Sequence, residues 1–317
     1  MSVEFKVPIY LMTGFLESGK TSFLNFTLAQ EYFQIDEPTL LILCEEGEEE
    51  YDKKVLKKSR TSVEVIDSIE ELTTERLVAY DAFYNPGRVI IEYNGMWQVS
   101  KLEELTFPSG WGIEQHIVTV DASTFQVYLN NMKSLFMEMV RNADLVLFNR
   151  ADTELPLANF RRSIKVVNPG AELIFEDEEG EIEDIFDGEM PFDVKAETIE
   201  IPNEDYGIWY LDARDHADTY NGKKVSFTGM VLKSREFAKN EFVPGRMAMT
   251  CCADDTTFLG FVCKSDEARH LKTGKWVNVV AKVKYEFVPA YGETGPVLYA
   301  ISVEETEPLK DELVYFS

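Results

Sequence analysis

Short apolar stretches alternate with amphipathic ones through the first 178 residues of the chain. The apolar stretches predict buried strands at Val7–Met12, Thr39–Cys44, Val63–Ile66, Arg88–Glu92, His116–Asp121 and Leu145–Phe148. Apolar residues at helical spacing predict helices at Thr21–Leu28, Ile69–Phe83 and Thr124–Val140. Because strands and helices alternate, we expect an α/β fold with a doubly wound, mainly parallel sheet whose functional residues lie at the carboxyl ends of the strands.

Beyond residue 200 the pattern changes to the two-residue period of half-buried strands. We predict strands at Val225–Ser234, Arg246–Cys252, Phe258–Cys263, Trp276–Phe287 and Val297–Val303, and one short helix at Ser265–Leu271. A hairpin turn near Asp255 places Cys263 opposite Ala248 in this prediction. This order of elements is the one expected of a small all-β, OB-like barrel. We therefore expect an α/β domain over residues 1–180, an acidic linker over 181–205 and the barrel over 206–317.

The junction between the first predicted strand and helix carries a complete phosphate-binding motif, G-x-x-x-x-G-K-[ST], at Gly14–Thr21. Gly14 and Gly19 permit positive φ and bring backbone N–H groups, with the dipole of the helix N-terminus, close to phosphate oxygens. Lys20 supplies a charge near the β and γ phosphates, and Thr21 offers a hydroxyl to Mg²⁺. This motif predicts a P-loop NTPase whose nucleotide contacts come from Gly14, Glu17, Ser18, Gly19, Lys20, Thr21 and Ser22.

An acidic segment, Glu45–Asp52, follows the second predicted strand and holds five glutamates and one aspartate in eight residues. Such a segment is either a solvated loop or a cation-binding one. Its position one strand after a phosphate loop favours a switch region near Mg²⁺. In that interpretation Glu45, Glu48 or Asp52 is a candidate Mg²⁺ ligand.

Glu92 ends another predicted strand, and Gly95 follows three residues later. In P-loop proteins a carboxylate at this place acts on Mg²⁺ directly or through water, and the glycine N–H senses the γ phosphate. We therefore predict Lys20, Glu92 and Gly95 as catalytic residues, with Glu92 also a Mg²⁺ candidate. His116 lacks neighbours at metal-ligand spacing and is expected to be structural.

Asn149-Arg150-Ala151-Asp152 has the shape of the guanine-recognition motif Asn-Lys-x-Asp, with Arg in place of Lys. A carboxylate accepts hydrogen bonds from N1–H and the exocyclic amine of guanine, whereas adenine has no N1–H to donate. Arg150 supplies the flat cationic surface that Lys usually supplies. The alternative is a polar strand-to-helix turn. The motif predicts GTP and GDP as ligands, bound through Asn149, Arg150 and Asp152.

Composition limits the partners and the compartment. The length of 317 residues suits about two domains. A net charge of −26, most of it in residues 1–199 (38 Asp and Glu against 17 Lys and Arg), disfavours nucleic acid and anionic membranes. Four cysteines form no disulfide framework, the longest apolar stretch is shorter than a membrane span, and Met1–Lys6 lacks the features of a signal peptide. We expect a cytoplasmic protein.

Together these motifs resemble the CobW-type GTPases, relatives of the nucleotide-dependent metallochaperones that serve urease and hydrogenase. The resemblance covers about the first 180 residues and rests on Gly14–Thr21, Glu45–Glu48 with Asp52, Ile91–Gly95, Asn149–Asp152 and Asn168–Pro169. It implies a GTPase that couples the nucleotide state to a transition metal, often zinc or cobalt, and to a client protein or metal-dependent enzyme. The family usually carries a Cys-x-Cys-Cys motif before the Glu-x-x-Gly strand, but Tyr51–Gly95 contains no cysteine.

The second half resembles the C-terminal domain of an uncharacterised family of bacterial proteins, some encoded with permeases, on Arg246–Asp255. That resemblance implies no activity. Cys251, Cys252 and Cys263 are candidate ligands for a transition metal, although neighbouring residues of a strand point to opposite faces. Buried core thiols are the alternative.

Three functions remain open from the sequence. The first is a GTP-hydrolysing enzyme, slow because no arginine finger can be identified. The second is a non-catalytic, GTP-dependent adaptor whose barrel binds a protein, a membrane transporter for example. The third is a reader of single-stranded nucleic acid that uses Lys233, Arg235, Arg246, Lys282 and Lys284, disfavoured because the barrel is net acidic. The oligomeric state stays open, a dimer included.

Overall fold

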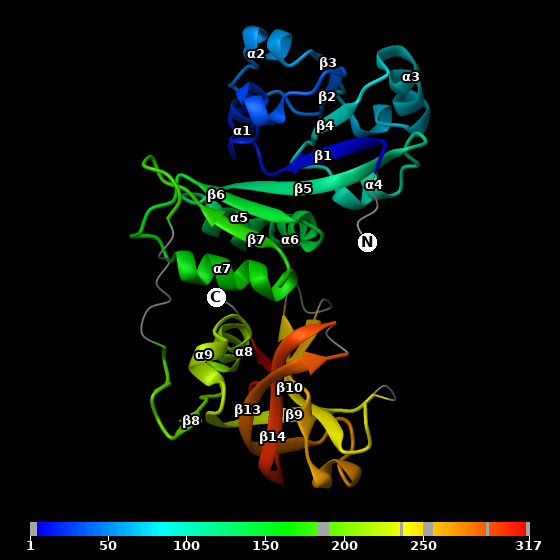
Figure 1. The fold of residues 1–317 in the computed structure, drawn as a ribbon. Helices are drawn as coiled ribbons and strands as arrows, with labels where there is room; N and C mark the ends of the chain where they lie inside the picture. Colours follow the sequence, from blue (N-terminus) through cyan, green and yellow to red (C-terminus); the bar gives the residue numbers. More distant parts are fainter. Residues whose placement is uncertain (1–4, 183–189, 235–236, 250–255, 290–291, 315–317) are drawn as a thin grey trace. The chain divides into compact units, whose positions relative to one another are not determined.

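The computed structural model describes residues 5–182, 190–234, 237–249, 256–289 and 292–314. The chain divides into two compact units, Met1–Ile185 and Phe186–Ser317 (Figure 1). The division predicted from the sequence, with a domain over residues 1–180, a linker over 181–205 and a barrel over 206–317, stays a prediction. Each unit is described by itself below.

The first unit is built on a seven-stranded sheet in which every neighbouring pair is parallel, in the order β3-β2-β4-β1-β5-β6-β7 (Figure 1). Its strands are β1 (Val7–Thr13), β2 (Thr39–Leu43), β3 (Thr61–Val65), β4 (Arg88–Glu92), β5 (Trp111–Asp121), β6 (Leu145–Asn149) and β7 (Glu172–Phe175). The α/β fold with a parallel sheet, predicted from the alternating pattern, is confirmed.

The helices of this unit are α1 (Lys20–Ala29), α2 (Lys53–Lys58), α3 (Thr74–Tyr84), α4 (Val99–Glu103), α5 (Phe125–Asn131), α6 (Lys133–Arg141) and α7 (Leu157–Val167). The continuous apolar strands pack on both sides. Leu40 and Ile42 of β2 join a cluster with Leu77 of α3, while Leu41 between them joins a cluster with Leu24 of α1. Burial on both faces explains why these strands are apolar at every position.

The single helix predicted over Thr124–Val140 is wrong, because the chain leaves helical geometry at Met132, where φ is −133° and ψ is 32°. Asn130 and Asn131 precede the break, and asparagine is a weak helix former. The break lets Phe125 of α5 and Phe136 of α6 meet edge to face with ring centroids 5.4 Å apart. Aromatic packing therefore replaces one long helix with two short ones.

The second unit is mostly β. Its strands are β8 (Thr198–Glu200), β9 (Lys224–Leu232), β10 (Glu241–Met249), β11 (Thr256–Gly260), β12 (Cys263–Lys264), β13 (Trp276–Val288), β14 (Glu293–Thr306) and β15 (Leu313–Val314). Its helices are α8 (Tyr206–Asp215) and α9 (Ala217–Tyr220), and a four-residue 3₁₀ turn at Asp266–Arg269 stands where a short helix was predicted. β8 pairs with β9 and lies within the segment predicted as linker.

The strand pairings of this unit form a closed circuit, β9–β10–β12–β14–β13–β9. All are antiparallel except β12 with β14. Alternate residues of β9, such as Val225 and Phe227, point into a core shared with Trp209 of α8. Side chains of period two therefore fill the inside of the circuit.

The predicted hairpin between β10 and β11 is present, but its register is not the predicted one. β10 and β11 are paired from Gly245 with Gly260 to Met249 with Thr256, which is a different register from the one that a turn near Asp255 gives. Cys263 consequently lies opposite Phe242 and not Ala248. The turn itself, residues 250–255, is outside the described part of the chain.

Two of the basic residues considered for a nucleic-acid groove, Arg246 and Lys233, are engaged in hydrogen bonds, whereas Lys282 and Lys284 are exposed. Arg246 is 2% exposed, and its guanidinium donates to the carbonyl oxygens of Asn203, Asp311 and Glu312. The Lys233 ammonium donates to the carbonyl of Ala268. Arg235 lies outside the described residues. The prediction that Arg246 is available to a ligand is therefore wrong, because the arginine holds the chain before β15.

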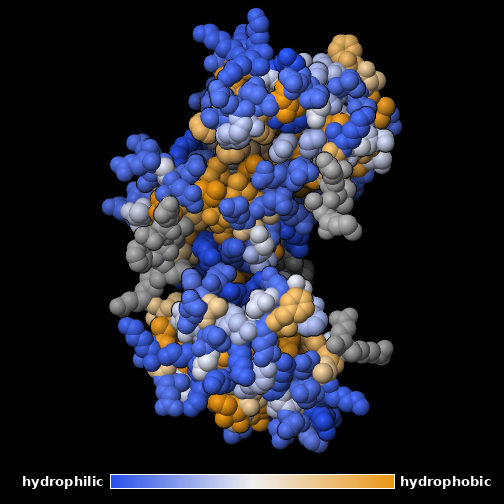
Figure 2. Space-filling view, in the orientation of Figure 1, coloured by the Kyte–Doolittle hydropathy of each residue, from blue (hydrophilic) through white to orange (hydrophobic). Residues whose placement is uncertain are grey.

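Hydrophilic side chains cover most of the visible surface of each unit (Figure 2). Tyr32 and Phe83 are exposed aromatic residues of the first unit. In the part of the chain that the structure describes, every helix is too short or too polar to cross a bilayer.

Gly245 of β10 is a position where only glycine fits. A Cβ there would overlap the carbonyl of Leu259 and lie 2.6 Å from Cε1 of Phe258. We expect Gly245→Ala to destabilise the protein by about 1–3 kcal/mol through overpacking. Urea unfolding followed by circular dichroism measures this, with Gly170→Ala as control because a Cβ at Gly170 meets only Asn168 Oδ1 at 3.6 Å. Equal midpoints for the two variants would contradict the expectation.

Candidate functional site

The phosphate loop, Gly14–Thr21, connects β1 to α1 in a conformation that two glycines make possible. Gly14 has φ +141° and Gly19 has φ +95°, which L side chains rarely adopt. A Cβ on Gly14 would lie 2.8 Å from Thr119 Oγ1, and one on Gly19 would overlap the amide of Asn149. The loop thus lies directly against the ends of β5 and β6.

The N-terminus of α1 is open to an anion. Gly19 is its N-cap, and neither a capping side chain nor an acidic residue in the first turn satisfies its N–H groups within the described chain. Uncapped N–H groups and the helix dipole both favour negative charge at this end. This end of α1 therefore supplies the electrostatic setting that a phosphate requires.

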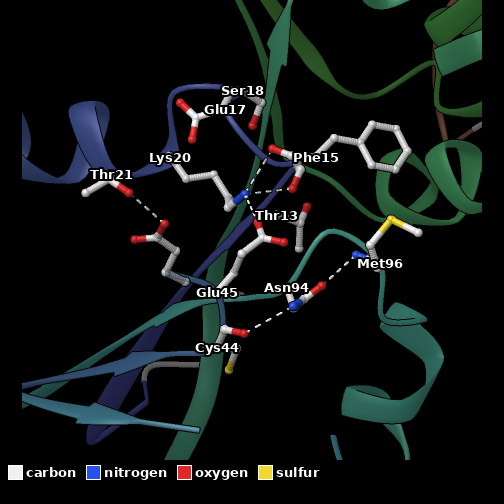
Figure 3. Close-up of polar contacts among 12 residues, drawn as sticks. Thr13, Phe15, Glu17, Ser18, Lys20, Thr21, Cys44, Glu45, Asn94 and Met96 are labelled. Atoms are coloured by element: carbon white, nitrogen blue, oxygen red, sulfur yellow. Dashed lines mark hydrogen bonds and ion pairs between the residues drawn. The ribbon is translucent and has the colours of Figure 1, made fainter. Parts of the chain in front are cut away.

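Lys20 is almost fully buried, at 4% exposure, and its ammonium lies inside the loop (Figure 3). It donates to the carbonyl oxygens of Gly14 at 2.9 Å and Phe15 at 3.0 Å, and to Glu45 Oε2 at 2.6 Å. A buried ammonium is stable only with partners of this kind. Glu45, the first residue of the acidic segment, is thus the anion that Lys20 binds in this structure.

The acidic segment is exposed to solvent over residues 46–50 and is hydrogen-bonded to α1. The carboxylate of Glu49 accepts a hydrogen bond from Ser22. Asn25 donates to the carbonyl of Glu50 at 3.1 Å and accepts from the backbone of Asp52 at 3.1 Å. The loop and α1 therefore hold this segment in place.

Glu92 lies at the end of β4, 2% exposed, between two hydroxyl groups. Thr21 Oγ1 donates to Glu92 Oε1 at 2.9 Å, and the hydroxyl of Tyr51 donates to Glu92 Oε2. Burial raises the pKa of Glu92 above its ordinary value, against the opposing effect of these hydrogen bonds. Burial and the neighbouring Glu92 raise the pKa of Tyr51 far above its usual range, so Tyr51 stays a hydrogen-bond donor.

The structure brings together only some of the predicted Mg²⁺ candidates. Thr21 and Glu92 converge, and a cavity of about 280 Å³ lined by Thr21, Glu45 and Tyr51 adjoins them. Glu45 instead faces Lys20, Glu48 meets Glu17 through its backbone N–H at 3.2 Å, and the Asp52 carboxylate caps α2 through the N–H of Lys54. The oxygen pair nearest the loop is therefore Thr21 with Glu92.

Gly95 brings the segment after β4 against the phosphate loop. A Cβ at Gly95 would overlap the carbonyl of Gly14 and lie 2.8 Å from Cα of Phe15. Asn94 fixes this segment by donating to the carbonyl of Cys44 at 3.3 Å and accepting from the N–H of Met96 at 2.8 Å (Figure 3). Met96 itself is 60% exposed.

The residues predicted to recognise guanine lie at the end of β6, beside the loop. The amide of Asn149 donates to the carbonyl of Ser18, and its Oδ1 is buried without a protein partner in the described chain. Arg150 donates to the carbonyl of Glu17 at 2.9 Å and pairs with Asp121 at 2.5 Å. Asp152 is exposed, and its carboxylate accepts from the N–H of Glu154 at 2.9 Å.

The sequence did not identify three residues that complete this site: Tyr51, Thr119 and Asp121. Thr119 Oγ1 lies 2.8 Å from the Ser18 hydroxyl, which it fixes inside the loop. Asp121 ends a strand at the same sheet edge as Glu92, and this position is a signal that the sequence did contain. No feature of the sequence identifies Tyr51, because its contact with Glu92 depends only on the path of the acidic segment in the folded chain.

No transition-metal site is evident among the residues that the structure describes, since no group of three or more His, Cys, Asp or Glu could hold a metal there. Cys263 is buried, and burial raises the pKa of its thiol to about 12. Cys251 and Cys252 lie outside the described residues.

His116 is buried beneath the loop. Its Nε2 lies 2.9 Å from Thr13 Oγ1, and its backbone N–H donates to Asp144 at 2.8 Å. Burial lowers the pKa of His116 to about 4, so the ring is neutral near pH 7. These contacts agree with the structural role predicted for it.

Comparison with known proteins gives two family matches. The family described as CobW/HypB/UreG, nucleotide-binding domain, matches residues 8–175, and the DUF1980 C-terminal domain matches residues 182–316. Both agree with the resemblances drawn from the sequence motifs. No curated protein matches the chain.

Similar solved structures include hydrogenase maturation factor HypB from Archaeoglobus fulgidus, 18% identical over 54% of this chain and 82% of that one, with a TM-score of 0.38. Zn(II)-bound YjiA GTPase from E. coli is 19% identical over 70% of this chain and 72% of its own, with a TM-score of 0.42. HypB from Helicobacter pylori in complex with nickel is 14% identical over 54% of this chain and 78% of its own, with a TM-score of 0.35.

The pKa of His116 predicts an acid-dependent loss of stability. The folded pKa of about 4 lies below the ordinary histidine value of 6.5, so the unfolded state binds the proton first as the pH falls. We expect wild type to lose about 2 kcal/mol more than His116→Gln between pH 7.5 and pH 5. Urea unfolding of both proteins at the two pH values isolates this difference, since the carboxylates titrate in both. Equal losses would show that the folded state protonates His116 as readily as the unfolded state does.

Proposed function

Because the chain belongs to the CobW/HypB/UreG family through its nucleotide-binding domain, we propose that it binds GTP and hydrolyses it to GDP and phosphate. The observation that carries this proposal is the phosphate loop. Its two glycines adopt positive φ, its lysine amine is buried inside it, and the uncapped end of α1 follows. An anion of the size and charge of a nucleotide phosphate suits this arrangement.

The proposed guanine site is formed by Asn149, Arg150 and Asp152. Asn149 Oδ1 is a buried acceptor without a protein partner in the described chain, which is rare unless a ligand supplies the donor. Asp152 lies on the exposed side, where its carboxylate is accessible to N1–H and the amine of guanine. These features support a preference for guanine over adenine.

The residues present fit Mg²⁺. Thr21 and Glu92 offer hard oxygen donors 2.9 Å apart, next to the proposed phosphate position, and Mg²⁺ uses one or two such groups together with phosphate oxygens. Mg²⁺ bound there with the nucleotide neutralises charge on the phosphates. Tyr51 donates to the other oxygen of Glu92 and holds that carboxylate in its orientation.

In the proposed hydrolysis Lys20 stabilises negative charge on the transferred phosphoryl group, and Glu92 and the Gly95 N–H orient the attacking water. We expect slow turnover. In the described chain the cations that line the loop pocket are Lys20 and Arg150, and Arg150 is already paired with Asp121. Met96, directly after Gly95, has no group that orients water. A partner protein is proposed to supply the missing group.

Nucleotide binding is proposed to move the acidic segment. The three hydrogen-bond donors of the Lys20 ammonium have three partners in this structure, so a phosphate oxygen must replace one of them. Of these three partners, Glu45 is the one with a negative charge, and a phosphate oxygen also carries negative charge. Release of Glu45 would free the start of a segment that also contacts Ser22 and Asn25.

A client protein is the partner proposed to sense this movement. The closed strand circuit of the second unit, with its one parallel pair, supports an OB-like barrel as the domain that binds the client. Zinc or cobalt, implied by the family resemblance, is kept as cargo carried with the client, because the described residues form no site of their own for it.

The second candidate is a GTP-dependent adaptor without catalysis, favoured by the exposed thioether of Met96 next to Gly95. Steady-state phosphate release distinguishes the two functions. Release above background with Mg²⁺, alone or with zinc or cobalt added, supports the enzyme. Tight GTP binding with release at background under every condition supports the adaptor.

Guanine recognition is tested by exchanging the base. We expect Asp152→Asn to weaken GTP binding by about 100-fold and to gain xanthosine triphosphate, because an amide complements the xanthine edge. Calorimetry of both proteins with both nucleotides and Mg²⁺ measures this, with Glu154→Gln as a control. Wild type that is indifferent to GTP would refute the whole proposal, and unchanged selectivity would refute the role of Asp152.

Glu45 is tested by removing its charge. If Glu45 competes with phosphate for Lys20, Glu45→Gln binds GDP about 10-fold more tightly in the absence of Mg²⁺, the usual worth of a charge-assisted hydrogen bond. Glu46→Gln removes the same charge one residue away and is expected to leave the affinity unchanged. If Glu45 is instead a Mg²⁺ ligand, Glu45→Gln weakens binding, and only when Mg²⁺ is present.

A further inference from the structure

Asp121 ends β5 at the edge of the sheet that carries the phosphate loop, and no sequence motif includes it. Its Oδ1 accepts from the N–H and the hydroxyl of Ser123 at 2.9 and 2.6 Å. Its Oδ2 accepts from the guanidinium of Arg150 at 2.5 Å. Burial alone raises the pKa of Asp121, but the hydrogen bonds from Ser123 and Arg150 outweigh it and keep the carboxylate ionised.

Arg150 is fixed at both its backbone and its guanidinium. Its φ of 50° is left-handed, a conformation that non-glycine residues rarely adopt. Its guanidinium reaches Asp121 on one side and the carbonyl of Glu17 on the other, at 2.9 Å. The side chain remains 54% exposed and lines the pocket formed by the loop. A planar cation is therefore held with part of its surface open to that pocket.

We propose that Asp121 is a positioning residue for nucleobase binding, which fixes the guanidinium of Arg150 as a flat surface for the base. This inference rests on the proposed function and adds a residue to it. A guanidinium stacks on aromatic rings, and a free arginine side chain loses rotamer freedom when it does so. Because Asp121 already holds the guanidinium in one position, this rotamer freedom is not lost when the base binds. Asp121 therefore preorganises the base site.

The position of Arg150 assigns it to the base and not to the phosphates. Its neighbours in the chain, Asn149 and Asp152, belong to the guanine-recognition motif. The charge inside the loop comes from Lys20, which contacts the carbonyls of Gly14 and Phe15, whereas Arg150 contacts that of Glu17. The two cations line the same pocket but contact different carbonyls of the loop, and the proposed function assigns Arg150 to the base end of the nucleotide.

Sheet architecture does not explain the ion pair. β5 and β6 are already joined by backbone pairing of Asp121 with Asn149, and the N–H of Ala122 donates to the carbonyl of Asn149 at 3.0 Å. A half-exposed ion pair adds little to folding stability. A purely structural role predicts no difference between the effects on GDP and on tripolyphosphate when the pair is broken, so binding measurements distinguish the two roles.

The test is Asp121→Asn in the full chain, titrated by calorimetry with GDP and with inorganic tripolyphosphate, a probe that has no base. We expect GDP binding to weaken about 2- to 10-fold, the usual cost of ordering one long side chain, and tripolyphosphate binding to stay unchanged. Arg150→Met should give the same loss, and the double variant should add nothing further, since both changes remove one interaction. Glu104→Gln, which breaks the exposed pair with Lys101, is the matched control.

Each outcome decides the inference. Equal weakening of GDP binding and tripolyphosphate binding would overturn the inference. It would show that the Asp121–Arg150 pair acts on the phosphate loop through Glu17. Unchanged GDP binding in Asp121→Asn would overturn it too, and leave the proposed function standing. If Asp121→Asn does not fold, Arg150→Met alone decides by the same comparison of the two ligands. Wild type that binds tripolyphosphate but not GDP would remove the proposed function and this inference together.

Discussion

The buried ammonium group of Lys20 is the group on whose partners the arrangement of the site in the first unit depends. Lys20 is held inside its own loop, where a positive charge without partners would be very costly. The carbonyls of Gly14 and Phe15 contribute dipoles, and Glu45 contributes the opposing charge. Because Glu45 begins the acidic segment, this single charge connects the loop after β1 with the chain after β2. In the proposed function an anion that replaces Glu45 breaks this connection.

The parallel sheet explains why residues distant in sequence meet here. The carboxyl ends of parallel strands share one edge, so the loop after β1, Glu92 of β4, Asp121 of β5 and Asn149 of β6 lie together. Their contacts form two groups. Thr21, Glu92 and Tyr51 surround the proposed metal and phosphate position, and Asp121 and Arg150 lie on the proposed base side. In the proposed complex the two ends of the nucleotide therefore face different strands of one sheet.

In the second unit, tertiary contacts give Arg246 a different role from the one that its sequence suggests. Arg246 is one of the basic residues that its sequence offers to an anionic ligand, yet backbone carbonyls of Asn203, Asp311 and Glu312 enclose its guanidinium. A buried guanidinium needs several acceptors, and here they are supplied by segments that lie far from β10 in the sequence. Its role is therefore to hold the chain ahead of β15.

The sequence by itself determined the parallel sheet, the phosphate loop and the family, because apolar periodicity and the G-x-x-x-x-G-K-[ST] spacing are local properties. It did not determine the break at Met132, the register of Cys263 or the pairing of Glu45 with Lys20. Each of these depends on contacts between distant segments: aromatic packing of α5 on α6, the extent of strand pairing in β10, and the path of an acidic loop over α1. Only the folded chain brings those partners together, so tertiary structure decided them.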